Sequence, residues 1–436
     1  MSRAYLAVGS NLGDREGHLR HALSRLGSFS RVTAGSPIYE TEPIGGPAGQ
    51  GAFLNAVIGI ETKLDARALL NSVLEVESER GRVRSERWGP RTLDIDLLWF
   101  DGIEIDEPGL TVPHPGIRER GFVLAPLLDV APGLADGAGP YAEAYRAVGS
   151  SGLIRRSGPV DETGTRWMAG LEEAVRPAAD GSVIAHPDWA NTSGDAFGGF
   201  LTAVALHRAG SLRPGSLPSH LTYRFLHPVP AGRELDVSTV VHRMSASSMD
   251  MTVTLMLDAE VVGRCAVGVI DRPVVPEVAP VAPRVMALHE CIPVTELMPG
   301  TDRDLGASIR SWTPLERWDV PDLQDGSGAV LRAWSPNVVL GVGDPFLYAA
   351  ALVMPIDALI WPATMGRLGR LPSGPVLATP TIELTARFAD LTNDAWFLGE
   401  AVVDHITDRS VAGTVRMWGD GGRYLAVGHS LNLVRR

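Results

Sequence analysis

Lysine is almost absent from this chain of 436 residues: Lys63 is the only one, although lysine and arginine together number 39. A phosphate-binding loop of the Gly-Lys-Ser/Thr type needs a lysine directly after a glycine run. Lys63 lies instead in Glu61-Thr62-Lys63-Leu64, without such a run. Any chemistry on a polyphosphate must therefore use arginine side chains and a metal ion.

Cysteine is also scarce. Cys265 and Cys291 can form neither a disulfide framework nor a metal knuckle, so we expect two buried thiols and a cytoplasmic protein. No stretch approaches the roughly 20 apolar residues of a membrane helix, and the first residues contain no secretory cleavage site. The net charge of −12 disfavours a nucleic-acid surface, so neither membrane nor nucleic acid is an expected partner.

A pair of aspartates gives the strongest chemical signal. Asp94 and Asp96 lie two residues apart at the start of an apolar run that predicts a strand, so their side chains should share one face. Such a pair suits Mg²⁺ bound together with substrate phosphates, which nearby arginines would hold. Taken alone, the pair is explained equally well by the solvated face of a strand.

Periodicity divides the chain into two parts. Residues 4 to about 130 alternate strand-like runs with helical patterns, including a helix from Ala66 to about Arg80 that Asp65 should cap. A stretch rich in Gly, Ala and Pro from residue 131 to 140 then indicates a domain boundary before about Pro159.

The remaining residues contain an internal repeat. Leu221–Phe225 recurs as Leu384–Phe388, an offset of 384 − 221 = 163, and His242 and His405 share that offset. Each copy begins with an apolar helix, expected at 200–209 and 347–360, and continues as alternating strands. We therefore expect two copies of one α+β unit joined by a Pro-rich linker at 272–283, with the two histidines in packing roles.

Ordered motifs in the first 130 residues carry a family resemblance. They include Val8-Gly9-Ser10-Asn11-Leu12-Gly13-Asp14, Tyr39-Glu40-Thr41-Glu42-Pro43, Phe53-Leu54-Asn55-Ala56, Arg87-Trp88-Gly89-Pro90-Arg91-Thr92-Leu93-Asp94-Ile95-Asp96 and Thr111-Val112-Pro113-His114. This part resembles the 6-hydroxymethyl-7,8-dihydropterin pyrophosphokinases of folate biosynthesis. The resemblance implies a ferredoxin-like α/β sandwich in which ATP, with two Mg²⁺ ions, gives its β,γ-diphosphate to the pterin hydroxymethyl group and leaves AMP.

The resemblance also assigns residues. Asp94 and Asp96 would hold the metals, with Arg82 and Arg91 completing the catalytic set. The nucleotide would be bound by Glu77, Arg84, Arg87, Trp88, His114 and Arg120. The pterin would be bound by Thr41, Pro43, Asn55 and a ring sandwich of Phe53 and Phe122. Phosphoryl transfer mainly needs positioning and charge stabilisation, which such a set can supply.

Residues from about 160 onward resemble the thioesterase-like double hotdog proteins. Gly194-Asp195-Ala196-Phe197-Gly198-Gly199-Phe200 and Thr381-Ile382-Glu383-Leu384-Thr385-Ala386-Arg387-Phe388 carry this resemblance. It places an acyl site at Gly198, Gly199, Asp357 and Thr381, with Ser430 where the family has a glutamine. Asp357 and Thr381 are explained equally well as an ordinary helix acid and strand residue. Without the glutamine, we expect hydrolysis to be impaired.

The sequence thus predicts an α+β pyrophosphokinase at 1–157, a first hotdog repeat at 158–283 and a second at 284–436. Its substrates would be ATP and hydroxymethyldihydropterin, with acyl-CoA as a further partner and the hotdog half as an oligomerisation surface. The hotdog half would be an altered acyl-CoA thioesterase or an inactive acyl-binding module. The alternative for the whole chain is a thioesterase-class protein whose kinase-like domain only binds ligand.

Overall fold

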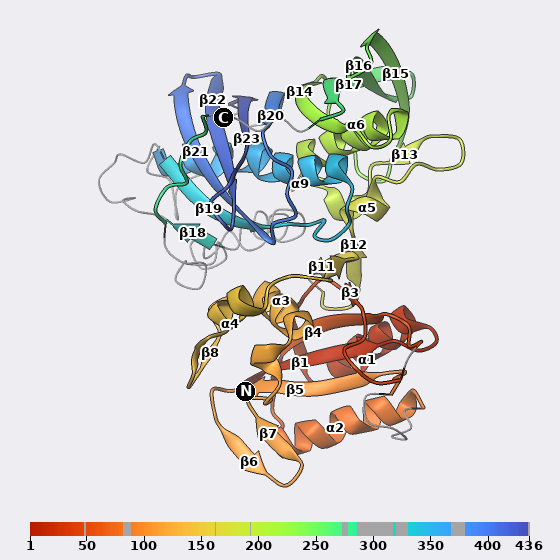
Figure 1. Ribbon diagram of the computed structural model, residues 1–436, viewed down its shortest axis with the longest axis vertical. Coiled ribbons are helices and arrows are strands. Elements are labelled where there is room, and N and C mark those ends of the chain that lie inside the picture. The colour runs from red at the N-terminus through yellow and green to blue at the C-terminus, as the bar shows by residue number, and fades with distance from the viewer. Residues whose placement is uncertain are drawn as a thin grey trace. The chain divides into compact units, whose positions relative to one another are not determined.

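The computed structural model describes residues 1–47, 49–81, 89–161, 163–191, 193–272, 278–285, 317–319, 330–367 and 380–434. The chain forms two compact units that divide between Gly170 and Leu171 (Figure 1). Each unit has its own sheet and is described by itself.

The first unit is a ferredoxin-like α/β sandwich. Its six-stranded sheet has the order β10-β3-β4-β1-β5, with β2 also paired to β4, and the pairs are antiparallel. The strands are β1 (Ser2–Ser10), β2 (Arg31–Gly35), β3 (Tyr39–Thr41), β4 (Phe53–Thr62), β5 (Asp94–Phe100) and β10 (Ile154–Arg155). Figure 1 shows α2 (Ala66–Glu79) and α3 (Gly121–Val130) on opposite sides of this sheet, and α1 (Arg15–Phe29) joins α2 over one core.

Local sequence explains where these helices begin. The side chain of Asp14 accepts a hydrogen bond from the Gly17 amide at the start of α1. Asp65 accepts one from the Ala68 amide at the start of α2, so the predicted cap is confirmed. Both helices bury their apolar stripe against one face of the sheet, in a core that includes Leu6, Val8, Leu19, Leu23, Ile58, Leu69, Val73, Ile95 and Leu97.

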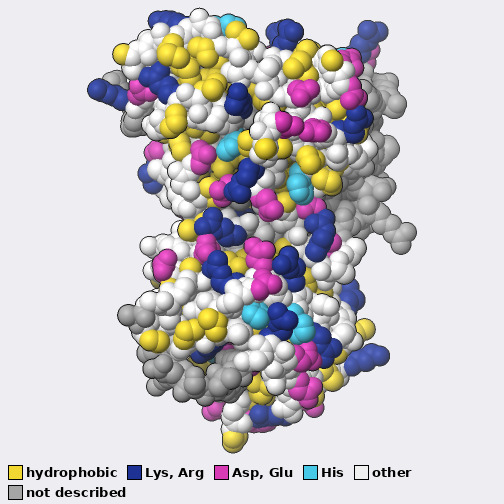
Figure 2. Space-filling view, turned by 90° about the vertical axis from the view of Figure 1, so that its right-hand side faces the viewer, with side chains coloured by type: hydrophobic (Ala, Val, Ile, Leu, Met, Phe, Trp, Pro, Cys, Tyr) yellow, Lys and Arg dark blue, Asp and Glu magenta, His cyan; other side chains and the backbone are white. Residues whose placement is uncertain are grey.

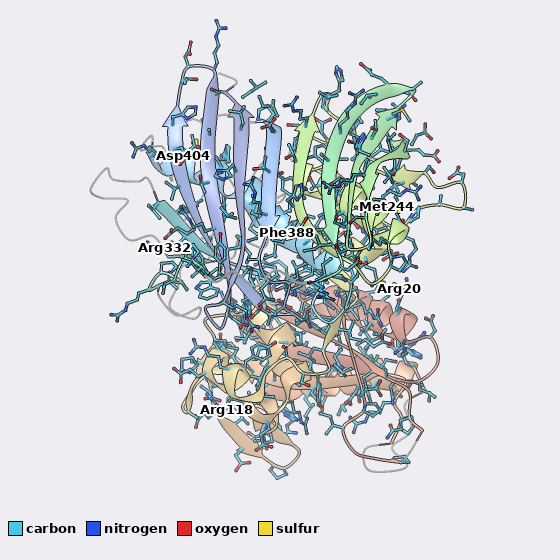
Figure 3. The ribbon with its side chains drawn as sticks, turned by 45° about the horizontal axis from the view of Figure 1, so that its top comes forward. Arg20, Arg118, Met244, Arg332, Phe388 and Asp404 are labelled. Carbon is cyan, nitrogen blue, oxygen red and sulfur yellow. The ribbon has the colours of Figure 1, made fainter. Side chains whose placement is uncertain are left out.

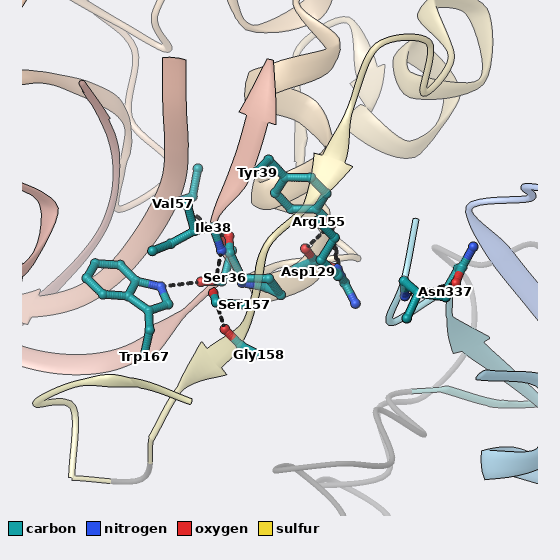
Figure 4. Close-up of polar contacts among 12 residues, drawn as sticks. Ser36, Ile38, Tyr39, Val57, Asp129, Arg155, Ser157, Gly158, Trp167 and Asn337 are labelled. Atoms are coloured by element: carbon teal, nitrogen blue, oxygen red, sulfur yellow. Dashed lines mark hydrogen bonds and ion pairs between the residues drawn. The ribbon is translucent and has the colours of Figure 1, made fainter. Parts of the chain in front are cut away.

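Shorter elements complete the first unit. They are β6 (Ile105–Glu107), β7 (Leu110–Val112), η1 (Ile117–Glu119), β8 (Ala135–Asp136), β9 (Gly139–Pro140), α4 (Tyr141–Val148), β11 (Ser157–Val160) and β12 (Trp167–Ala169). Figure 4 shows how the C-terminal strands β10 and β12 of this unit attach to the sheet. Arg155 of β10 pairs with Asp129 at 2.6 Å, and Tyr39 donates a hydrogen bond of 2.6 Å to the same carboxylate. Further along, the indole of Trp167 donates to the Ser36 carbonyl at 2.8 Å.

The second unit is a double hotdog in which two helix-plus-sheet repeats share one 11-stranded sheet. The first repeat contains α5 (Leu171–Ala174), β13 (Val183–Ile184), η2 (Pro187–Trp189), α6 (Gly198–Leu212), β14 (Leu217–Phe225), β15 (Glu234–Met244), β16 (Ser248–Leu257) and β17 (Glu260–Ile270). The second contains β18 (Arg317–Asp319), β19 (Val330–Pro336), α9 (Pro345–Ala358), α10 (Ile360–Arg367), β20 (Thr381–Phe388), β21 (Trp396–Ile406), β22 (Ser410–Gly419) and β23 (Tyr424–Leu433).

The predicted repeat is confirmed, because β14 and β20 pair antiparallel with Thr222 opposite Thr385. The two central helices α6 and α9 pack against each other.

The prediction that His242 and His405 occupy matching positions in the two repeats is wrong. In β15 the residue left out of register is His242, whereas in β21 it is Asp404, an offset of 404 − 242 = 162. The contacts agree, because His242 lies 2.8 Å from the Thr252 hydroxyl and Asp404 accepts a 2.9 Å bond from Thr414. His242 and His405 are exposed, so neither has the expected packing role.

Two expectations from composition have different outcomes. Cys265 is buried, as predicted, and burial raises the pKa of its thiol; Cys291 lies outside the described residues. The expectation that no apolar stretch approaches 20 residues is wrong. Helices α9 and α10 form an apolar segment of 21 residues, Pro345–Met365, whose most apolar window is 89% buried inside the protein. The segment is apolar because a central hotdog helix is surrounded by protein on most sides.

Candidate functional site

Asp94 and Asp96 project from the start of β5 to one face of the first-unit sheet, as predicted. Both are half-buried, whereas Ile95 lies in the helix-covered core. Strand pairing sets Asp94 opposite Gly9 of β1, and Gly9 opposite Asn55 of β4. Because directly opposed residues of antiparallel strands share a face, the carboxylates and Asn55 lie on the same side, with only a glycine between them.

Gly9 keeps this part of the face open. A Cβ placed on Gly9 would stand 3.1 Å from Asn55 Oδ1, closer than an ordinary contact. Asn55 is buried, and its Nδ2 donates a 2.8 Å hydrogen bond to Thr41 Oγ1, which fixes the orientation of the amide. The glycine therefore leaves space between an oriented amide and the carboxylate pair.

Aromatic side chains lie close to this amide. Phe53 is two residues before Asn55 on β4 and opposite Thr41 of β3, so all three share the open face. Phe122 belongs to the first turn of α3, the helix that packs on β4, and is half-buried. Pro43, also half-buried, follows β3. The structure brings Thr41, Phe53 and Asn55 together, and attaches Phe122 and Pro43 to elements that flank them.

Asn11 organises the site, and the sequence reasoning missed this role. Its Oδ1 accepts a 2.7 Å hydrogen bond from the backbone N–H of Arg91, and its backbone N–H donates a 3.1 Å hydrogen bond to the Arg91 carbonyl. Its Nδ2 donates 3.2 Å bonds to Gln50 Oε1 and the Gly51 carbonyl. Asn11 thus ties the segment before β4 to the segment before β5. The available signal was an asparagine directly after a buried strand.

Two further contacts fix the carboxylate pair. The guanidinium of Arg91 forms an ion pair with Asp94. Glu77 of α2 is buried, and its Oε1 accepts a 2.7 Å bond from the Ile95 amide. Glu77 therefore holds the backbone between the two aspartates from the helix-covered side of β5.

His114 and Arg120 lie on the segment that follows β7. The His114 amide donates to the Leu98 carbonyl of β5 at 2.8 Å, and its Nδ1 accepts a 3.1 Å bond from the Gly116 amide. Nδ1 accepts only when it carries no proton, so Nε2 is the N–H donor of this ring. The Arg120 guanidinium lies over Gly116, where a Cβ would stand 2.7 Å from its Cζ. The other predicted contacts, Arg82, Arg84, Arg87 and Trp88, lie outside the described residues.

The donor set at Asp94 and Asp96 fits Mg²⁺. Two carboxylates on one face are what this ion takes from a protein when substrate phosphates supply further ligands. Within the described ranges, no group of three or more His, Cys, Asp or Glu side chains could hold a metal. Water and substrate phosphates would supply the remaining oxygens of an ion at this pair.

The predicted acyl-site residues meet inside the second unit. Asp357 of α9 is buried; its Oδ2 accepts a 3.0 Å bond from the Gly199 amide, and its Oδ1 accepts a 2.7 Å bond from Thr381 Oγ1. A Cβ on Gly198 would stand 2.6 Å from Asp357 Oδ2, so the glycine is needed for this approach. Burial raises the pKa of Asp357 to about 6, against the two hydrogen bonds, which lower it.

The expected loss of a side-chain amide from this site is wrong. Asn432 lies opposite Thr381 in the β20–β23 pair, and its Nδ2 donates a 2.9 Å bond to Thr381 Oγ1. Ser430, expected in place of the amide, donates to Asn432 Oδ1 instead. The register of the β20–β23 pair shifts between Thr381 and Glu383, and this irregularity sets Asn432 opposite Thr381.

The two repeats differ at the corresponding helix starts. Phe197 gives α6 no side-chain cap, and Asp357 of the other repeat accepts the Gly199 amide. The start of α9 is capped by its own Asp344, which accepts from Phe346 at 2.8 Å. With the offset of 163, Thr381 and Asn432 correspond to Pro218 and Val269, themselves a cross-strand pair. The described part of the chain therefore holds this constellation once.

Comparison with known proteins gives a clear result for the first unit. The model of the 7,8-dihydro-6-hydroxymethylpterin-pyrophosphokinase family matches residues 5–132. The chain is 43% identical over 157 residues to the 2-amino-4-hydroxy-6-hydroxymethyldihydropteridine pyrophosphokinase of Methylorubrum extorquens, which spans 99% of that protein and 36% of this chain. It is 47% identical over 129 residues to the Bacillus subtilis protein of the same name, covering 77% of that protein and 29% of this chain.

The second unit has more distant relatives. The model of the acyl-CoA thioesterase N-terminal domain matches residues 185–272. A solved structure from Thermobifida fusca, a candidate thioesterase II, aligns with a TM-score of 0.50 at 18% identity over 61% of this chain and 97% of the other. At this identity the likeness establishes the double hotdog fold alone.

Proposed function

Through its N-terminal unit the chain belongs to the 7,8-dihydro-6-hydroxymethylpterin-pyrophosphokinase family, and we propose the following roles for its residues in the family's reaction. The protein is a 2-amino-4-hydroxy-6-hydroxymethyldihydropteridine pyrophosphokinase of folate biosynthesis, with a thioesterase-like second unit. The observation that supports our assignment of roles is the cross-strand row Asp94–Gly9–Asn55, which sets the carboxylates beside the oriented amide.

The carboxylate end of this row binds the nucleotide. The family uses Mg-ATP, and Asp94 and Asp96 would hold two Mg²⁺ ions, which neutralise phosphate charge when bound. Arg91, whose backbone is held by Asn11, stabilises charge on the transferred group, and His114 donates from Nε2. Arg120, whose guanidinium lies over Gly116, adds a cation, whereas Glu77 acts by positioning β5.

The amide end of the row binds the pterin. Asn55, held by Thr41, offers an amide to the hydrogen-bonding edge of the ring. Phe53 and Phe122 stack on its faces, with Pro43 closing the side. Gly9 gives the hydroxymethyl group room to reach the phosphate end. Holding both substrates in this way supplies the proximity on which diphosphate transfer depends.

The test of these roles is a double variant, Asp94→Asn with Asp96→Asn. We expect AMP release from ATP and hydroxymethyldihydropterin to fall by at least about a thousandfold, because the phosphate charge loses its counter-ions. Asp106→Asn, on the exposed β6, is the matched control and should retain full activity. Retained activity in the double variant would contradict the assignment. ATP and pterin binding without AMP release from the wild type would favour a ligand-binding module instead.

We also propose a second activity, hydrolysis of an acyl-CoA thioester in the second unit. The supporting observation is the series of hydrogen bonds that links the Gly199 amide, Asp357, Thr381 and Asn432. An ionised Asp357 can accept a proton from water as the water oxygen attacks the thioester carbonyl. The C–S bond then breaks, and the proton passes to the departing thiolate, which leaves the free acid and a thiol. Because the pKa of Asp357 is about 6, activity should rise with pH through that value.

An acyl-CoA panel of several chain lengths tests this activity on the full chain. Asp357→Asn should lower turnover by about a hundredfold or more, while AMP release from the first unit stays unchanged. No turnover by the wild type at any chain length would leave an acyl-binding or oligomerisation module. The scarcity of cysteine supports the cytoplasm as the compartment in which both reactions occur.

A further inference from the structure

Strand β15 forms an open edge of the second-unit sheet. On its outer side, β13 pairs only with Glu234 and Leu235. Among the residues that the structure describes, no strand pairs with Asp236–Met244 on that side. Figure 3 labels Met244 at this edge and Arg332, on β19, toward the other end of the sheet. An edge of this length offers a row of backbone donors and acceptors to another strand.

The second repeat shows what such an edge accepts. Its equivalent strand, β21, is paired from Trp396 to Val402 by the antiparallel strand β19. With the offset of 162, those residues correspond to 234–240 of β15, of which β13 covers the first two. Within the part of the chain that the structure describes, residues 236–240 of β15 therefore lack the antiparallel neighbour that their counterparts have.

The side chains of this edge are unusual for a solvent-exposed strand. Val240 is 58% exposed, Val241 40% and Met244 68%. Figure 2 turns this side of the molecule toward the viewer, and hydrophobic side chains appear among charged ones on its upper surface. Exposed apolar side chains on an unpaired strand indicate a missing neighbour.

We propose that this edge binds the same edge of a second copy of the chain, antiparallel and about a two-fold axis at Thr239. In that register Thr239 lies opposite Thr239 of the second copy. Val237 faces Val241, an apolar pair on the inner side. Asp236 faces His242 and Arg243 together, because the bulge at His242 sets two residues against one.

The charge pattern selects a second copy as the occupant. Asp236 and Arg243 lie at opposite ends of the open stretch and on the same outer face. A two-fold axis between them places Asp236 of each copy beside Arg243 of the other, so the same ion pair forms twice in one interface. The occupied edge would also join two second-unit sheets into one continuous sheet, which satisfies the backbone groups of both strands.

Sedimentation of the full chain tests the proposal. The wild type should associate as a two-fold dimer, and Asp236→Arg or Arg243→Asp should each raise the dissociation constant at least about tenfold through like-charge repulsion. The charge-swapped double variant should recover most of the affinity. Asp408→Arg, an exposed acid on the turn between β21 and β22, is the matched control and should change nothing.

An intermolecular cross-link tests whether the two-fold axis of the dimer lies at Thr239. Thr239→Cys should form an intermolecular disulfide on mild oxidation, because opposed residues of antiparallel strands lie within disulfide range. Thr252→Cys, on the internal strand β16, should not, and the wild type reports any link through Cys265 or Cys291. A monomeric wild type overturns the proposal, as does a dimer indifferent to both charge reversals. AMP release should be unchanged throughout, so this test is independent of the proposed catalytic roles.

Discussion

Asp357 shows how the surroundings of one residue set its chemistry. Its carboxyl group is buried, and the two groups that donate to it, Thr381 and the Gly199 amide, are neutral. Ionisation therefore has to overcome desolvation, and burial raises the pKa to about 6. The same carboxylate that would activate water is thus a cost to the folded state.

Asp357→Asn measures that cost. A folded-state pKa of about 6 lies above the unfolded value of 3.8, so the folded state holds the proton more tightly. This contribution to stability is complete below the unfolded pKa and is lost as pH rises through the folded one. Relative to the variant, the free energy of unfolding of the wild type should fall by about 2 kcal/mol from pH 4 to pH 7. Urea unfolding at several pH values provides the measurement, with Asp408→Asn as the exposed control. A difference that does not change with pH would contradict the prediction.

Gly9→Ala tests the opening between the two substrates. The new methyl group would stand 3.1 Å from Asn55 Oδ1, and Asn55 cannot yield freely because Thr41 holds its amide. We expect the KM for the pterin to rise about tenfold while the KM for ATP and the folded structure change little. Steady-state AMP release with each substrate varied in turn separates these effects. An equal rise in both constants would show that the glycine serves folding instead.

At the scale of elements, β10 is held to β3 by one buried charged cluster. Arg155, Asp129 and Tyr39 bond to one another, and both charged side chains are largely buried. β3 also carries Thr41, so the cluster lies on the element that orients Asn55.

Removing one charge from this cluster should be costly. Arg155→Met leaves the Asp129 carboxylate buried without its cation, and we expect a loss of about 3–5 kcal/mol in the free energy of unfolding. The double variant Arg155→Met with Asp129→Leu removes both charges and should recover most of that loss. Denaturant unfolding of both variants supplies the comparison. Equal destabilisation of the single and double variants would mean that packing dominates over charge.

Elements with strong periodicity could be predicted, and register could not. The apolar run of β5, the stripe of α2 and its Asp65 cap each follow from neighbours in sequence. Asn432 and His242 owe their places to a register shift and a bulge, which depend on the partner strand. No property of either residue alone reveals those irregularities, so a fixed offset matched His242 to the wrong residue. The organising role of Asn11 likewise depends on segments 40 and 80 residues away.

At the scale of the whole molecule, the end of the first unit can be tested by truncation. The sequence predicts a boundary after residue 157, and this remains a prediction. The compact unit continues to Gly170, with Trp167 bonded to the Ser36 carbonyl and Val160 packed on Gly35.

Two fragments distinguish these ends. Residues 1–157 should be about 2–4 kcal/mol less stable than residues 1–170, because the shorter fragment loses the burial of Trp167 and Val160. Both should release AMP where they are folded, since Asp94 and Asp96 lie far upstream. Thermal and urea unfolding of the two fragments give the answer. Equal stability would place the end of the domain at the earlier position.

The pairing of β14 with β20 joins two repeats within one polypeptide. A dimer of identical subunits must carry every substitution twice, so a change that ruins one site ruins both. Covalent linkage removes that obligation. The first repeat carries Pro218 and Val269 at the positions where the second has Thr381 and Asn432. The two repeats are therefore free to diverge, and one asymmetric site forms from Gly199 of the first repeat and from Asp357, Thr381 and Asn432 of the second.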